Sequence, residues 1–118
     1  MAFQTPYIFV VSMDVAPEKE ALFNEVYDDE HVPALLQVAG VRNVSRFVQE
    51  PLKLSIGGEV KTVEIEGTPR YCAIYEIDSP DVLVSDAWAE AVEAGRWSTE
   101  VRPHTFNRSH VLRRVCSD

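Results

Sequence analysis

Between positions 7 and 15 the chain is mostly apolar, and its side chains alternate between two faces of an extended segment. Tyr7 and every second residue up to Val15 are apolar and share one face, whereas Ile8 and Val10 lie on the other. A strand that is apolar on both faces needs a cover on both. In a small antiparallel sheet helices cover one face, and the simplest cover for the second is another copy of the protein. The pattern predicts a strand over 7–15 and a homodimer formed through the sheet face.

A helical pattern follows this strand. The sequence Ala16-Pro17-Glu18 is typical of a helix start, because proline is favoured in the first turn and acidic side chains complement the helix dipole there. Apolar residues four positions apart then form one broad face that includes Phe23 and Tyr27. Pro33 lacks a backbone donor and restricts the residue before it. We therefore expect the helix to stop or bend near His31, with a short turn over 33–38 behind it.

Two strands and a hairpin are predicted in the middle of the chain. Residues 41–48 and 69–77 have the composition and alternation of strands. Between them, alternating apolar residues flank Gly57-Gly58, and two adjacent glycines between extended segments indicate a tight hairpin turn. We interpret residues 51–68 as an extra hairpin arm attached to the main sheet.

The last third of the chain completes the pattern. Apolar residues at helical spacing over 79–95 predict a second helix, which Gly95 should end, and residues 110–115 predict a last strand. Residues 96–109 show no periodicity and are expected to form a long irregular segment, which is often functional in a small domain. Without the hairpin, the order is βαββαβ, which predicts an α+β ferredoxin-like fold with an antiparallel sheet.

Composition agrees with one compact domain over 1–118, since 118 residues with 46% hydrophobic and 25% charged residues are ordinary for a globular chain. The net charge of −8 argues against nucleic acid and anionic membranes as partners. No apolar run approaches the roughly 20 residues of a membrane span, and no secretory signal is visible. Cys72 and Cys116 are interpreted as reduced thiols of a cytoplasmic protein.

The densest group of reactive side chains is the segment Tyr27-Asp28-Asp29-Glu30-His31. Tyr27 and His31 are four residues apart, so they share the apolar helix face that also carries Phe23. A histidine there is a candidate general base, because its pKa suits proton transfer near neutrality. The structural alternative is that His31 bonds a free helix-end carbonyl and that Tyr27 is a core residue.

This region resembles the EthD-like proteins of the dimeric α+β barrel superfamily. The resemblance rests on Tyr27 to Pro33, then Leu35-Leu36, then Gly40-Val41 ahead of a strand with Arg46. It extends through Arg70-Tyr71 and Tyr75-Glu76 to Trp88, and departs from the family at Ala39, where proline is frequent, and in the long segment 51–68.

The resemblance implies ferredoxin-like subunits whose sheets pack face to face as a homodimer, with a pocket between sheet and helices in each. It also implies His31 as general base, with Tyr27 beside it.

Further candidate site residues come from aromatic and basic side chains. His104, with Trp97 and Phe106, is a candidate lid over the pocket, although these aromatic rings can equally pin the segment to the helices. Arg46 and Arg108 are candidates to clamp a carboxylate or phenolate, or else to pair with acidic neighbours. Tyr75 and Trp88, together with Tyr7 and Tyr71, are candidates to line an aromatic pocket, with core packing as the alternative.

We expect no metal and no cofactor. His31, His104 and His110 lie on different segments without short ligand spacing, and the chain has no glycine-rich phosphate loop.

The favoured function is a cofactor-independent enzyme. It would act on a small hydrophobic carbonyl or phenolic compound, aromatic or polyketide-like, by His31-mediated proton abstraction, as a lyase, isomerase or cyclase. The alternatives are a cofactor-free monooxygenase of the same substrates, a non-catalytic binding protein for a hydrophobic metabolite or haem, and an interaction module whose pocket is filled by side chains.

Overall fold

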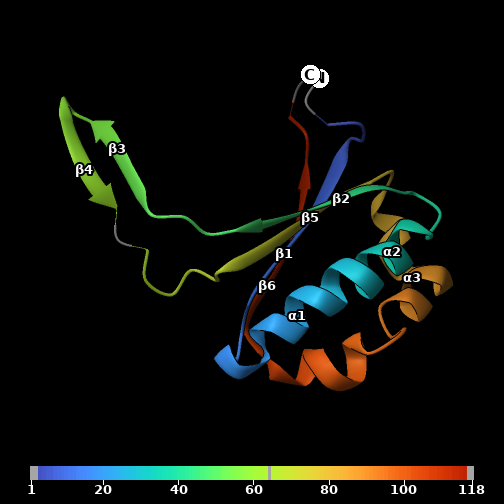
Figure 1. Ribbon diagram of the computed structural model, residues 1–118. Coiled ribbons are helices and arrows are strands. Elements are labelled where there is room, and N and C mark those ends of the chain that lie inside the picture. Colours follow the sequence, from blue (N-terminus) through green and yellow to red (C-terminus); the bar gives the residue numbers. More distant parts are fainter. Residues whose placement is uncertain (1–2, 64, 117–118) are drawn as a thin grey trace.

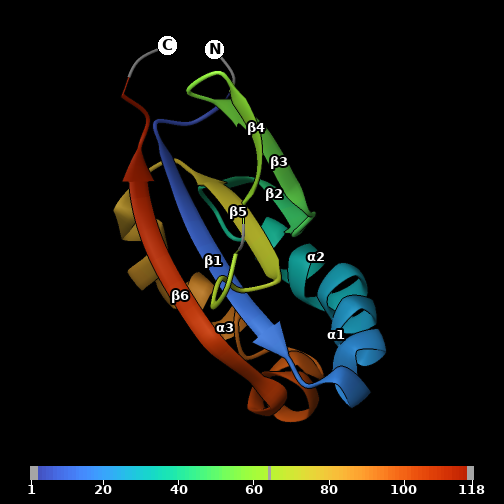
Figure 2. The same ribbon diagram turned by 90° about the vertical axis from the view of Figure 1, so that its left-hand side faces the viewer.

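A computed structural model of the chain describes residues 3–63 and 65–116. One antiparallel sheet of four strands forms its centre, and the helices lie against one of its faces (Figure 1, Figure 2). The strand order is β2 (Val41–Val48), β5 (Tyr71–Ile77), β1 (Tyr7–Val15) and β6 (Thr105–Arg114). This order and the βαββαβ connection confirm the predicted ferredoxin-like α+β fold.

The helix layer consists of short segments joined by tighter and wider turns. In chain order it comprises η1 (Pro17–Lys19), α1 (Glu20–Val26), η2 (Tyr27–His31), α2 (Val32–Leu36), η3 (Pro80–Val84), α3 (Asp86–Ala91), η4 (Trp97–Val101) and η5 (Arg102–His104). Of these, η2 and η4 are single π-helical turns. No helix among the described residues is long and apolar enough to cross a membrane.

The core lies between the sheet and this layer. Val11 and Met13 of β1 are buried on the helix side, and β5 adds Ala73 and Tyr75 in register with β1. Phe23 of α1 is fully buried against them. The alternation predicted for 7–15 is therefore confirmed, and Ile8 and Val10 lie on the opposite face, which no helix covers.

The helical backbone changes at His31, near the predicted stop or bend, and a short helix over Val32–Leu36 follows where a turn over 33–38 was predicted. The backbone widens into the π-helical turn η2 and continues directly into α2, which contains Pro33. In a regular α-helix the Pro33 ring would clash with the backbone carbonyl four residues earlier. The π-helical turn shifts the carbonyls by one residue, and Pro33 fits without that clash. Gly40, with a φ of 93°, then begins the return to β2.

The second helix is shorter than predicted. Ser85 is extended and interrupts the helical pattern, and its hydroxyl accepts a hydrogen bond from Trp88 N at 3.2 Å, so that α3 starts only at Asp86. The expectation that residues 96–109 are irregular is wrong. They form η4, η5 and the first half of β6, where a shift in register between Ser12 and Asp14 and the positive φ of Asn107 (52°) break the alternation.

The predicted hairpin is present, but it forms a sheet of its own. Its strands are β3 (Leu52–Ile56) and β4 (Glu59–Val63), joined at Gly57 and Gly58, both with positive φ. We call residues 52–63 the arm. It follows β2 and precedes β5 in the chain, and it projects away from the body of the molecule (Figure 1). It does not pair with the four-stranded sheet.

Candidate functional site

A cavity of about 210 Å³ lies between the sheet and the helix layer. Its walls are largely aromatic and aliphatic, and basic side chains complete the lining. Six of the predicted site residues line it, namely Tyr27, His31, Tyr75, Trp88, Trp97 and Arg108. A cavity of about 150 Å³ holds one benzene molecule, so this one suits a single substituted ring.

His31 reaches the cavity from η2, where the π-helical turn places it beside Tyr27. Its ring stacks on the indole of Trp97, with centroids 4.2 Å apart and planes 19° apart, and meets the Tyr27 ring edge-on at 5.1 Å. Only 5% of His31 is exposed. Its Nδ1 is buried and has no hydrogen-bond partner within the described part of the chain. A buried polar atom without a partner is rare in folded proteins and identifies a position where a ligand can bond.

The surroundings keep this imidazole neutral. Burial, together with the positive charges of Arg102 and Arg108, lowers the pKa of His31 to about 3, and the negative charge of Glu93 opposes this only in part. At neutral pH His31 is therefore an uncharged ring with a free acceptor or donor nitrogen. With the cavity empty it is a weak base, and its basicity depends on the charge of the group that enters the cavity.

Two tyrosine hydroxyls form the polar floor of the cavity. Tyr27 Oη lies 3.1 Å from Tyr75 Oη, and both rings are buried. Burial raises the pKa of each phenol, and the neighbouring Tyr27 raises that of Tyr75 further. Both stay protonated at neutral pH, so one hydroxyl donates to the other and the second O–H is left to donate elsewhere.

Basic side chains from the end of the helix layer and from β6 complete the lining. Arg102 is held by Glu93, at 3.0 and 2.5 Å, and by the carbonyl of Val92 at 2.7 Å. Arg108 also lines the cavity, and no carboxylate pairs with it within the described residues. Its guanidinium is 3.3 Å from Thr105 Oγ1 and 3.4 Å from His110 Nε2. Arg108 is thus a cation available to an anionic group in the cavity.

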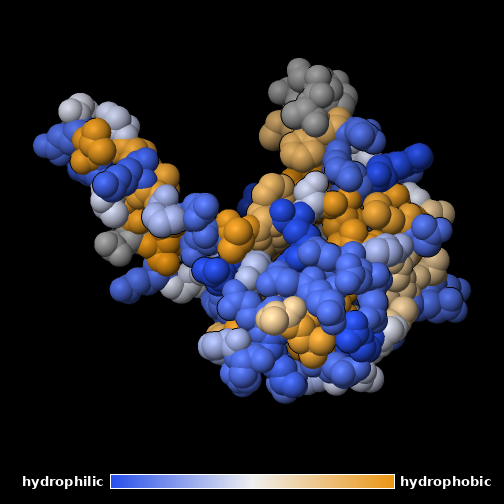
Figure 3. Space-filling model, viewed as in Figure 1, coloured by the Kyte–Doolittle hydropathy of each residue, from blue (hydrophilic) through white to orange (hydrophobic). Residues whose placement is uncertain are grey.

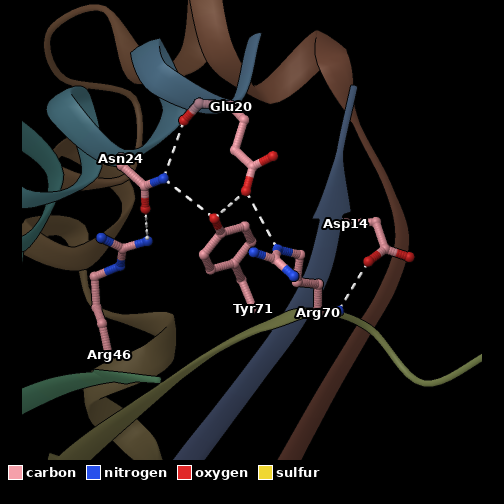
Figure 4. Close-up of polar contacts among 6 residues, drawn as sticks. All are labelled: Asp14, Glu20, Asn24, Arg46, Arg70 and Tyr71. Carbon is pink, nitrogen blue, oxygen red and sulfur yellow. Dashed lines mark hydrogen bonds and ion pairs between the residues drawn. The ribbon is translucent and has the colours of Figure 1, made fainter. Parts of the chain in front are cut away.

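Arg46 lies outside the cavity. Its guanidinium packs over the outer face of the Tyr27 ring, 4.4 Å from the centroid, and bonds Asp28 at 2.7 Å and Asn24 at 2.8 Å. Figure 4 shows how this arrangement continues through Asn24 to Tyr71, which donates to Glu20. Arg46 therefore pairs with an acidic neighbour, which was the alternative to clamping a ligand, and its guanidinium packs on the Tyr27 ring.

The structure also leaves His104 and Phe106 out of the cavity. His104 is half-buried in η5, and 53% of Phe106 is exposed on β6. Trp97 is different: only 2% of it is exposed, and its backbone begins a helical turn fixed by Arg96, which bonds Glu30 at 2.6 Å. The segment η4 is packed into the helix layer. This geometry favours the alternative in which Trp97 fixes the segment to the helices, and not a lid over the cavity.

The residues that line the cavity without having been proposed from the sequence as site residues include Arg102, Phe9 and His110. Phe9 and His110 come from neighbouring strands and stack on each other, with ring centroids 6.0 Å apart. Phe9 belongs to the helix-side alternation of β1, which the sequence shows, but His110 shares that face only through the register of β6 with β1. Within the described ranges, no three His, Cys, Asp or Glu side chains are arranged as a metal site, and both cysteines are free.

Comparison with known proteins extends the description of the fold. No family model matches the sequence, and no curated protein matches it. Among solved structures, an EthD (ethyl tert-butyl ether D) family protein from Bacillus halodurans C-125 superposes with a TM-score of 0.54 at 14% identity, covering 92% of this chain and 98% of that one. A dimeric ferredoxin-like protein of unknown function from Thermobifida fusca YX gives 0.55 at 12% identity, covering 98% and 96%.

A third similar structure is the heme-degrader MhuD from Mycobacterium tuberculosis, solved with two hemes in its active site. Its TM-score is 0.57 at 16% identity, with 96% of this chain and 98% of that one covered. Together with the topology, these likenesses show that the chain has a ferredoxin-like α+β fold. It shares this fold with an EthD family protein and with a dimeric ferredoxin-like protein.

Proposed function

We propose that the protein is a cofactor-independent enzyme that binds a small hydrophobic carbonyl or phenolic compound in this cavity and removes a proton from it with His31. The observation that carries the proposal is the buried, neutral imidazole whose Nδ1 has no partner. A histidine kept only for packing would have its polar atoms bonded, because an unbonded buried group destabilises the fold.

The chemistry follows from the groups around the cavity. The substrate's acidic C–H or O–H bond breaks, its proton passes to the imidazole, and the electron pair stays on the substrate as an enolate or phenolate. The free O–H of the Tyr27–Tyr75 pair then donates to the developing oxyanion. If the imidazolium returns the proton to a different carbon, the reaction is an isomerisation. If the enolate carbon attacks a second carbonyl of the same molecule and the imidazolium protonates that carbonyl oxygen, it is a cyclisation. If the electron pair forms a double bond as a group on the next carbon departs and takes the proton from the imidazolium, it is a lyase reaction.

The basicity of His31 favours a substrate that carries negative charge. A base whose pKa is about 3 is weak at neutral pH. A carboxylate or acidic phenol held by Arg108 would offset that guanidinium and favour the imidazolium form, which raises the pKa of His31. The bound substrate would thereby activate its own base, so we infer an aromatic or polyketide-like compound with an anionic group.

Two alternatives use the same cavity. The enolate or phenolate can react with oxygen, which would make the protein a cofactor-free monooxygenase. A neutral histidine also suits the axial position of haem, and MhuD binds haem in this fold. However, a cavity of about 210 Å³ has room for about one ring, and the four pyrrole rings of haem do not fit it as it stands. Haem binding would give a Soret band that is lost in His31→Ala.

Proton abstraction can be tested before the reaction is known. Small aromatic ketones, phenols and their carboxylated analogues are screened by the quenching of tryptophan emission, and those that bind are incubated in D₂O. For the ketones, we expect the wild-type protein to exchange the hydrogen on the carbon next to the carbonyl for deuterium, observed by NMR, and His31→Ala to bind the compound but exchange it at least about 100-fold more slowly.

His104→Ala is the matched control, because it removes a histidine that lies outside the cavity, and it should exchange at the wild-type rate. Exchange that persists in His31→Ala would show that His31 is not the base. Tight binding without any exchange would identify a non-catalytic binding protein.

A further inference from the structure

The arm has almost no contact with the rest of its own chain. Every residue of β3 and β4 is exposed, including five large apolar side chains, and Val60 is 75% exposed. The radius of gyration is 16.0 Å, whereas a compact chain of this length is expected at roughly 13.5 Å. Among residues 3–63 and 65–116, no contact explains why this segment is held away from the body (Figure 3).

The arm has an apolar face and a more polar one. Leu52, Leu54 and Ile56 point to the same side of β3, and the register with β4 places Val63 opposite Leu52 on that side. Lys53, Ser55, Val60 and Thr62 lie on the other side. Lys61 and Glu59, which form an ion pair, lie opposite Leu54 and Ile56 and so flank the apolar residues on the first side. A two-stranded hairpin is marginal in water without a cover for its apolar face. The pattern is that of a segment which packs against a surface outside its own chain.

The arm projects on the side of the sheet that the helices leave uncovered. In Figure 1 the arm and the helices lie on opposite sides of the strands, and Figure 2, seen from the arm's side, shows the strands in front of α3 and the arm in front of the strands. The uncovered face is apolar across its middle. Val10, Ile74 and Val111 form one row on it, and Phe47, half-exposed, lies beside them.

We propose that the arm clasps a second copy of this chain that is seated on the uncovered face of the sheet. A two-fold axis through that face would bring two like apolar surfaces together and would direct each arm toward the other copy. Such a two-fold dimer would cover both the helix-free face of the sheet and the apolar side of the arm, which are exposed in the single chain. The likeness to a dimeric ferredoxin-like protein supports this occupant, and the net charge of −8 argues against nucleic acid.

The proposal is tested by measuring the dimer dissociation constant of the wild-type protein and two variants by sedimentation velocity, without any ligand. Leu54→Asp places a charge on the apolar face of the arm, and Ser55→Asp places the same charge on the opposite face of the same strand. We expect the wild-type protein to be a dimer and Leu54→Asp to raise the dissociation constant at least about tenfold. Ser55→Asp should stay within about threefold of the wild type.

The fold is not at risk in either variant, because the arm lies outside the core, and unchanged near-ultraviolet circular dichroism checks this. Equal dissociation constants for the two variants would overturn the clasp while leaving a sheet-to-sheet dimer in place. A wild-type protein that remains monomeric would overturn both. Neither result depends on the reaction at His31, so failure here is distinct from failure of the proposed function.

Hydrogen exchange gives an independent reading of the arm. The amides of residues 52–63 should exchange slowly in the dimer and at nearly unprotected rates after dilution to the monomer, because the hairpin alone is marginal. Slow exchange in the monomer would show that the arm is stable by itself, and fast exchange in the dimer would show that it is not engaged. Either result contradicts the proposal.

Discussion

At the scale of single residues, the stack of His31 on Trp97 decides the chemistry of the cavity. The indole covers one face of the imidazole, and Nδ1 has no hydrogen-bond partner among the described residues. The result is a histidine that is neutral far below its ordinary pKa. This state has a measurable consequence for stability.

Stability should fall at acid pH through His31. The folded-state pKa is about 3 and the unfolded value is 6.5, so protons bind the unfolded chain first as the pH falls below 6.5. Between pH 7 and pH 4.5 this group alone should lower the free energy of unfolding by about 2–3 kcal/mol. Urea unfolding of the wild type and His31→Gln at both pH values isolates the effect. Parallel losses in the two proteins would show that His31 titrates normally when folded.

Arg108 should select ligands by charge. Arg108→Gln is expected to weaken the binding of an aromatic carboxylate about tenfold, because a charge-assisted hydrogen bond is lost. Binding of the corresponding neutral amide should be unchanged. Arg113→Gln, on the opposite face of the same strand, serves as the control, and isothermal titration calorimetry measures all pairs. Equal weakening of carboxylate and amide would indicate a steric role for Arg108.

The site could be predicted in part from local spacing. Tyr27 and His31 are four residues apart on an apolar face, and that spacing placed them correctly together in the cavity. Arg46 could not be placed from its sequence neighbours, because it reaches Asp28 and Asn24 only through the packing of β2 beside α1. Contacts of that kind depend on tertiary structure.

At the scale of elements, strands with regular alternation were predicted with correct bounds, as for β1 and β2. The predicted bounds are wrong where a single residue changes the backbone conformation. Ser85 splits the second helix by capping α3 with its own side chain, and Asn107 breaks the alternation of β6. Pro33 is tolerated because the turn before it is π-helical, a feature for which the sequence carries no clear signal.

Gly95 joins two of these elements and should be sensitive to substitution. Its φ is 65°, and an added Cβ would lie 2.6 Å from Glu30 Oε1, which is held by Arg96. Gly95→Ala should therefore lower the free energy of unfolding by about 2 kcal/mol, through backbone strain and a weakened Glu30–Arg96 pair.

Gly67→Ala is the matched control, since Gly67 also has a positive φ (76°) but open space at its Cβ position. We expect it to cost about 1 kcal/mol in urea unfolding. Equal losses for the two variants would show that the contact with Glu30 contributes nothing.

At the scale of the whole molecule, charge should oppose assembly. Two copies of net charge −8 repel each other, and salt screens that repulsion. We expect the dimer dissociation constant to fall several-fold as sodium chloride rises from about 20 to about 200 mM, measured by sedimentation velocity. A dissociation constant that rises with salt would show that ion pairs between the copies outweigh their net repulsion.

The position of the arm also bears on how such a protein can diverge. The cavity is built from the sheet and the helix layer, and no residue of the arm lines it. Changes in residues 52–63 can therefore alter which chains recognise one another without altering the chemistry. Two related copies in one cell could become separate homodimers, or an obligate mixed pair, through substitutions confined to this hairpin.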